Sequence, residues 1–91
     1  MMYRFTTFDD KTEIVHSEQQ NDGTVRVYIE RPMHLGFKSV ECLLPDYIWK
    51  DNDGFSAEEL SFFDEFLHSA ADEILRLARR KAADNVGMSD N

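Results

Sequence analysis

The sequence predicts an α+β fold, in which an antiparallel β-meander of three to four strands packs against one long C-terminal helix. Two stretches between residues 24 and 44 alternate apolar and polar side chains, which is the period of a half-buried strand. The last third of the chain carries apolar residues at helical spacing after a complete start signal. Strands followed by a single helix are typical of the α+β class.

Four stretches of the chain are expected to form strands. Tyr3–Phe8 is rich in aromatic residues and threonine, which favour strands, and Thr12–Glu18 forms a second, less regular candidate. Asn21-Asp22-Gly23 supplies a hairpin turn, because glycine adopts positive φ at no steric cost. Thr24–Arg31 and Phe37–Leu44 then alternate cleanly.

Two prolines mark the expected ends of these strands. Pro32 is expected to end the first of them and Pro45 the second, because proline cannot donate to a ladder. The segment Asp46–Gly54 is expected to be a loop that carries the aromatic residues Tyr47 and Trp49.

A helix is predicted from Ser56 to Lys81. Ser56 and Glu59 form a capping box, and Phe55 with Leu60 forms a hydrophobic staple across the same cap. One apolar stripe contains Leu60, Leu67, Ala71, Ile74 and Ala78. A second stripe contains Phe62, Phe66, Ala70 and Leu77, with Phe63 between the two. Together they span about 220°, against roughly 100° for an ordinary surface helix.

Two interpretations account for the second stripe. In the first, the chain is a homodimer, because exposed apolar surface of this size usually marks a contact between proteins. In the second, the loop Tyr47–Phe55 covers the stripe, or the helix breaks near His68-Ser69. For the homodimer the interface residues are predicted to be Phe62, Phe66, Leu77 and Phe63, with Tyr47 and Trp49 at the rim.

Length and composition limit the class of protein. The chain has 91 residues, which predicts a single domain over 1–85 and a disordered tail over 86–91. The single Cys42 fits a reducing compartment, and no apolar run resembles a signal peptide or a membrane span. A cytoplasmic protein without membrane contact is expected.

The net charge of −8 argues against general binding to nucleic acid, which needs cations to displace phosphate counterions. The basic residues that gather near the end of the helix are Arg76, Arg79, Arg80 and Lys81. Basic residues there complement the helix dipole, and a contact with an anion or a nucleic acid is the alternative use of this cluster.

No pattern for catalysis, cofactor or metal binding emerges. Asp51-Asn52-Asp53-Gly54 fails as an EF-hand, because Trp49 and Leu60 would occupy two ligand positions. His16, His34 and His68 show no ligand spacing, and Cys42 is in register with core residues. We therefore expect neither an enzyme nor a bound cofactor.

One junction resembles a known family. Leu44-Pro45-Asp46, Gly54 and Ser56-Ala57-Glu58-Glu59 are similar to the turn and helix start of HicB-type antitoxins, where a partial RNase-H-like sheet precedes a helix. The present helix is longer, and the small-residue sequence of that family is absent. The leading hypothesis is therefore a small acidic protein-interaction module that forms homodimers through its C-terminal helix. The alternative is an antitoxin-like regulator that binds nucleic acid or a basic protein.

Overall fold

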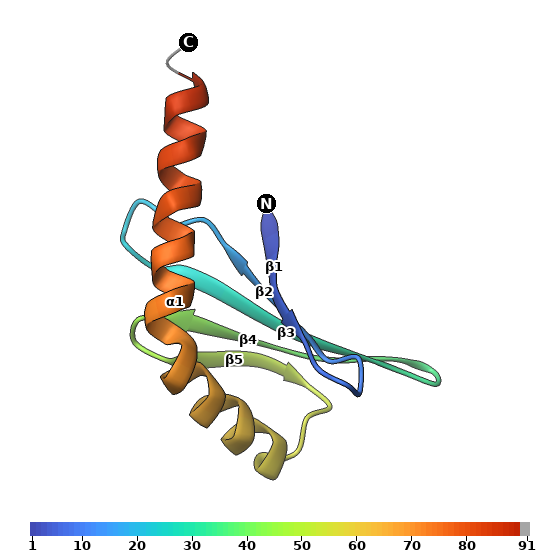
Figure 1. Cartoon of the computed structure of the whole chain (residues 1–91). Coiled ribbons are helices and arrows are strands. Elements are labelled where there is room, and N and C mark those ends of the chain that lie inside the picture. Colours follow the sequence, from blue (N-terminus) through green and yellow to red (C-terminus); the bar gives the residue numbers. More distant parts are fainter. Residues whose placement is uncertain (90–91) are drawn as a thin grey trace.

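Five antiparallel strands and one helix make up the fold (Figure 1). A computed structural model describes the backbone of residues 1–89 and the side chains of residues 1–85. The elements are β1 (Met2–Thr7), β2 (Glu13–Ser17), β3 (Val25–Met33), β4 (Gly36–Leu44), β5 (Ile48–Asp53) and α1 (Ala57–Ser89). The strands lie side by side in chain order, each antiparallel to the next. The α+β class and the meander are thus confirmed.

The strand count is higher than expected, because most of the predicted loop Asp46–Gly54 forms β5. Its sequence hides the strand, since its last four residues are lysine, asparagine and two aspartates, which are depleted in strands. Pairing with β4 brings Trp49 opposite Cys42, and the register shifts between Glu41 and Ser39 of β4. The edge position tolerates the polar residues because one side of the strand faces solvent.

Pro32 lies inside β3, although it was expected to end that strand. The β2–β3 pair nearest to Pro32 joins Glu13 to Glu30, so β3 extends beyond the end of β2 at Pro32. Pro32 pairs only with Phe37 of β4, so the missing N–H costs no bond to β2. The β3–β4 hairpin therefore extends beyond the other strands as an arm (Figure 1).

The predicted turn and helix start are both present. Gly23 has a φ of 88°, and the Asp22 carboxylate accepts hydrogen bonds from the backbone and hydroxyl of Thr24. The Ser56 hydroxyl accepts from the Glu59 backbone at 3.1 Å, and the Glu59 carboxylate accepts from the Ser56 backbone at 3.0 Å. α1 continues beyond Lys81, and residues 90 and 91 of the predicted tail lie outside the described residues.

The core lies between α1 and one face of the sheet. Its members are fully or almost fully buried: Ile14, Val25, Val27, Ile29, Val40, Cys42, Leu44, Phe55, Phe63, Leu67, Ala71, Ile74 and Ala78. The strand residues among them alternate along their strands, so they share one face. The first apolar stripe of the helix is therefore the packed stripe, as predicted, and within residues 1–89 no helix covers the other face of the sheet.

Arg31 joins three parts of the fold at the start of the helix. Its guanidinium donates to the Thr12 hydroxyl at 2.7 Å, pairs with Asp10 at 3.1 Å and forms a short ion pair with Glu59. It also lies over the Phe55 ring, 5.3 Å from its centroid. Hydrogen bonds from Ser56 and then from Arg31 lower the pKa of Glu59 to about 2.

We expect Glu59→Gln to lower the free energy of unfolding at pH 7 by about 1–2 kcal/mol, through loss of these charge-assisted bonds. Because the folded pKa lies below the ordinary value of 4.5, the contribution of Glu59 is complete above pH 4.5. It is lost as the pH falls towards 2. Urea unfolding at pH 7 and pH 3 measures both effects.

The matched control is Glu58→Gln, which removes a charge from the same first turn of the helix. Glu58 is exposed, so only its weak interaction with the helix dipole is lost. Equal stability of the two variants at pH 7 would contradict the role assigned to Glu59.

Candidate functional site

Phenylalanines gather on the side of α1 that faces β1. Phe5 of β1 and Phe8, just after that strand, meet Phe62 and Phe66 of the helix. The ring centroids lie 5.1 Å apart for Phe8 and Phe66, 6.0 Å for Phe8 and Phe62, and 6.3 Å for Phe5 and Phe66. All three pairs meet edge to face. We call these four residues the aromatic flank.

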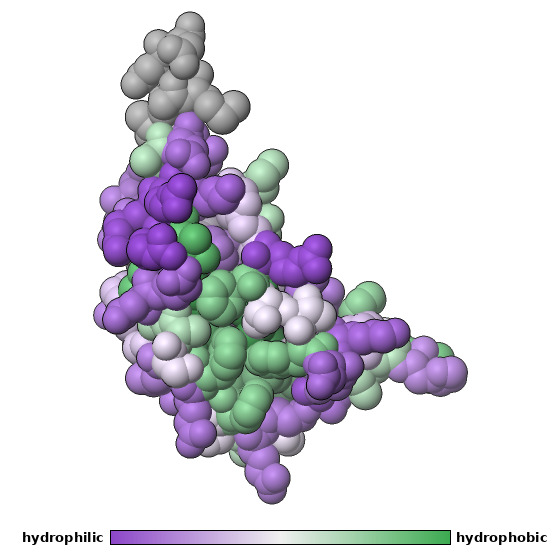
Figure 2. Space-filling view, in the orientation of Figure 1, coloured by the Kyte–Doolittle hydropathy of each residue, from purple (hydrophilic) through white to green (hydrophobic). Residues whose placement is uncertain are grey.

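The aromatic flank is partly open to solvent. Phe62 is 56% exposed, and the other three rings pack against the core while remaining half-buried. Figure 2 shows an apolar area beside the helix in the middle of the face displayed. Edge-to-face pairs contribute about 0.5–1.5 kcal/mol beyond burial, so the rings are held in fixed positions. An ordered and exposed aromatic surface of this kind is suited to contact another protein.

The predicted interface residues separate into three places. Phe62 and Phe66 lie in the aromatic flank, and the half-buried Leu77 follows them along the same side of the helix. Phe63 is only 1% exposed and contacts Phe55 in the core, at 5.0 Å between ring centroids. Its predicted place in an interface is therefore incompatible with its position in the folded chain.

Tyr47 and Trp49 lie on the other side of the helix. The Tyr47 ring stacks on His68 at 3.8 Å, and the Trp49 indole N–H donates to Asp64 at 3.1 Å. At 100° per residue, Asp64 and His68 lie about 200° from Phe62 and Phe66. The two aromatics therefore cannot form the rim of the aromatic flank, and the rings that cover the second stripe come from β1 and its following loop.

An open hollow of about 460 Å³ borders the aromatic flank. Thr7, Phe8, Asp9, Asp10 and Phe62 line it. Hydrogen bonds from Thr12 and the charge of Arg31 lower the pKa of Asp10. Aromatic walls beside carboxylates suit a guanidinium or ammonium group with an apolar stem.

The predicted basic cluster is divided, because Arg76, Arg79 and Arg80 fall within a sector of about 100° on one side of the helix, whereas Lys81 lies about 100° beyond Arg80. Arg76 pairs with Glu73, and the Lys81 ammonium lies 4.8 Å from the centroid of the Tyr3 ring. Arg76, Arg79 and Arg80 are all exposed, and Arg76 lies between the other two in angle around the helix. An anion that spans all four side chains would have to reach around the helix.

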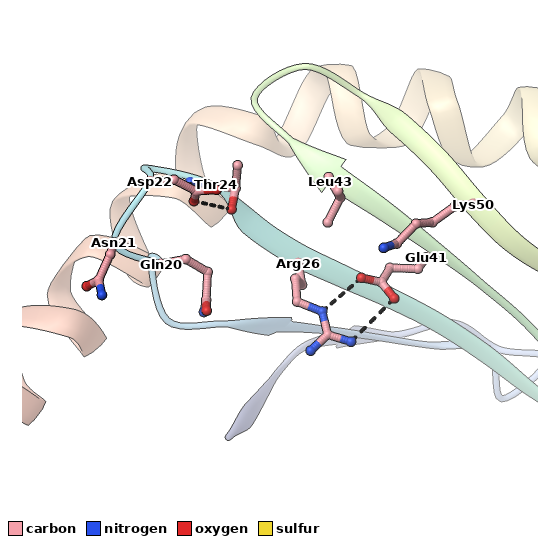
Figure 3. A pocket seen from close by; sticks show the side chains of 8 residues that line it. All are labelled: Gln20, Asn21, Asp22, Thr24, Arg26, Glu41, Leu43 and Lys50. Carbon is pink, nitrogen blue, oxygen red and sulfur yellow. Dashed lines mark hydrogen bonds and ion pairs between the residues drawn. The ribbon is translucent and has the colours of Figure 1, made fainter.

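A second hollow, of about 490 Å³, lies on the uncovered face of the sheet (Figure 3). Arg26 forms two hydrogen bonds to Glu41, at 2.8 and 3.4 Å. These bonds, and then the charge of Lys50, lower the pKa of Glu41 against the opposing effect of burial. The lining residues include no cysteine, serine or histidine, and their charges are largely neutralised within the hollow.

Cys42 is a core residue, as predicted. It is fully buried, and burial raises the pKa of its thiol to about 12. His16 is buried in the sheet, with its Nδ1 2.8 Å from the Ser17 carbonyl. In the part of the chain whose side chains are described, no three histidine, cysteine, aspartate or glutamate residues group as metal ligands.

Among residues 1–89, the single helix is not apolar enough over any membrane-spanning length to cross a bilayer. Comparison with protein-family models, with curated proteins and with solved structures finds no match to this chain.

Cys42 should react with a thiol reagent such as Ellman's reagent only when the protein unfolds. The buried thiol forms almost no thiolate at pH 8, since its pKa is about 12, and the reagent cannot reach it. Reaction followed at increasing urea concentrations should coincide with unfolding measured by circular dichroism. Rapid reaction without urea would contradict the buried position.

Phe66→Ala should lower the free energy of unfolding by about 2–3 kcal/mol, because Phe66 packs against Phe5, Phe8 and the core. Phe62→Ala should cost less than about 1 kcal/mol, since this ring is largely exposed. Urea unfolding of both variants at low protein concentration measures the difference. Equal losses would show that the two rings contribute equally to the intrachain core.

Proposed function

We propose that this chain is a small acidic, non-catalytic protein-interaction module whose contact surface is the aromatic flank. The observation that carries the proposal is Phe62, which is 56% exposed at the surface of an otherwise packed aromatic cluster. Aromatic side chains dominate the binding energy of protein interfaces when a partner desolvates them. The neighbouring rings hold Phe62 in place, which reduces the conformational entropy lost on binding.

The charge around the aromatic flank supports a partner with basic residues. Asp9 and Asp10 are exposed beside the Phe8 and Phe62 rings, and the chain carries a net charge of −8. Complementary charges at the rim of an interface increase the association rate and exclude acidic partners. A basic side chain with an apolar stem would satisfy both the rings and the carboxylates.

The absence of a catalytic role is likewise our proposal. It is supported by the burial of the one thiol and by the pairing of Arg26 with Glu41 in the hollow on the sheet. The antitoxin-like alternative stays a prediction. Its basic-protein form would use the same acidic rim, whereas its nucleic-acid form would use the divided cluster at the helix end.

Site-specific photo-crosslinking in the native host tests the proposal. A benzoylphenylalanine in place of Phe62 should yield adducts of defined mass, because the ring would lie in the interface. Phe37 is the matched control, since it is 61% exposed but lies on the arm formed by β3 and β4. Adducts at position 37 and none at position 62 would overturn the assignment of the aromatic flank.

A further inference from the structure

The outer edge of β1 is free among residues 1–89, because β1 is the first strand of the sheet and pairs only with β2 (Figure 1). Main-chain groups along an antiparallel strand point alternately to its two sides. The Phe8 backbone N–H donates to the Thr12 carbonyl at 2.8 Å, so Phe8 faces β2. The N–H and carbonyl of Thr7, one residue earlier, therefore point away from the sheet.

The same alternation places the main-chain groups of Arg4 on the free edge. Along β2, Ile14 shares the side of Thr12 and faces β1, whereas Val15 faces β3. Arg4 lies opposite Val15, so its N–H and carbonyl point away from β2. The register shift between Arg4 and Thr6 adds one residue to β1 alone, and β2 spans it as a regular strand. A further strand on the outer side can span it in the same way.

The opposite edge of the sheet is poorly suited to a further strand. Asp51 of β5 has a φ of 57°, which interrupts the extended backbone, and the last four residues of β5 are all polar. Charged residues and irregular backbone at an edge oppose pairing with another chain. β1 instead carries aromatic residues and threonines, which favour strands, and Arg4 is its only charged residue. Of the two edges, β1 is the one that accepts a strand.

The free edge of β1 lies beside the aromatic flank. Phe5 and Phe8 contact Phe66 on the helix side of the sheet, but both rings remain half-buried. A sixth strand would lie about 4.8 Å beyond β1, and every second side chain along it would point to the helix side. Apolar side chains at these alternate positions would cover the open edges of the rings. One extended segment can therefore use both the free edge and the aromatic flank.

We propose that the partner is another protein that adds an extended segment to the free edge of β1 as an antiparallel sixth strand. This inference rests on the proposed function and specifies how the partner binds. Antiparallel pairing continues the pattern of the sheet and is slightly more stable per residue than parallel pairing. A second copy of this chain is disfavoured, because both copies would carry a net charge of −8.

The antiparallel direction places the start of the segment beside the hollow at the end of β1. Asp9 and Asp10 line this hollow, whereas Lys11 of the same turn does not. Arg31 already pairs with Asp10 at 3.1 Å, so the exposed Asp9 supplies the charge that a partner meets. The aromatic walls of the hollow accept the apolar stem of a basic side chain. The expected segment therefore begins with a basic residue and continues with apolar side chains at alternate positions.

Amide hydrogen exchange followed by NMR on the whole chain tests this mode of binding. The probe is a blocked eight-residue peptide that begins with arginine and then alternates valine and threonine. Exchange of the Arg4 and Thr7 amides should slow at least about tenfold, because the added strand accepts their hydrogen bonds. The Phe8 amide is the internal control, since it already donates to Thr12. Unchanged exchange at Arg4 and Thr7 up to the solubility limit of the peptide would overturn the inference.

A matched peptide with glutamate in place of the arginine tests the direction of the added strand. It should bind at least about tenfold more weakly, because its carboxylate would lie beside Asp9. Equal affinity of the two peptides would contradict the antiparallel placement. Slower exchange at Arg4 and Thr7 that grows with protein concentration, without any peptide, would assign the edge to a second copy and overturn the choice of partner.

Photo-crosslinking at position 62 separates this inference from the proposed function. Thr7→Pro and Arg4→Pro each remove an outward N–H without removing a bond to β2, and proline is tolerated at such edge positions. Either variant that keeps the wild-type circular dichroism spectrum should lose most of the adducts formed at position 62. Undiminished adducts would exclude strand addition and leave the proposed function standing. Absence of any adduct at position 62 in the otherwise unchanged chain would overturn the proposed function itself.

Discussion

A single helix has to cover one face of a five-stranded sheet, and the rest of the structure follows from this constraint. A helix is about 10 Å wide, whereas strands lie about 4.8 Å apart, so α1 reaches only the central strands. The edge strands must close the gap with large side chains. Phe5 and Phe8 do so beside β1, and Tyr47 with Trp49 does so beside β5.

Different contacts join α1 to the two edge strands of the sheet, and this difference creates the candidate site. On the β5 side, a stack on His68 and a hydrogen bond to Asp64 engage the polar groups of the helix. On the β1 side, only rings meet rings, and the outermost ring, Phe62, remains more than half exposed. Two carboxylates then border an apolar surface that residues 1–85 leave uncovered. The same asymmetry gives the helix one side suited to an intermolecular contact.

Arg31 fixes the helix relative to the sheet at the end where this surface lies. It connects Asp10 and Thr12, next to the hollow, with Glu59 in the first turn of α1. The loop that carries Phe8 and the helix that carries Phe62 are therefore held by one cation. Because that cation is largely buried, its removal would leave charges without partners and would loosen both walls of the hollow together.

Local signals in the chain predicted several elements correctly: the turn at Gly23, the capping box of Ser56 and Glu59, the packed stripe of α1 and the core position of Cys42. Which surfaces meet depends on contacts between distant parts of the chain. β5 forms because β4 offers a free edge, and Phe63 is buried because Phe55 folds beneath it. The four rings of the aromatic flank come together from residues more than fifty positions apart. The spacing of apolar residues predicts which face of a strand or helix is buried. It does not predict which residue packs against that face, because this depends on how the sheet and helix come together.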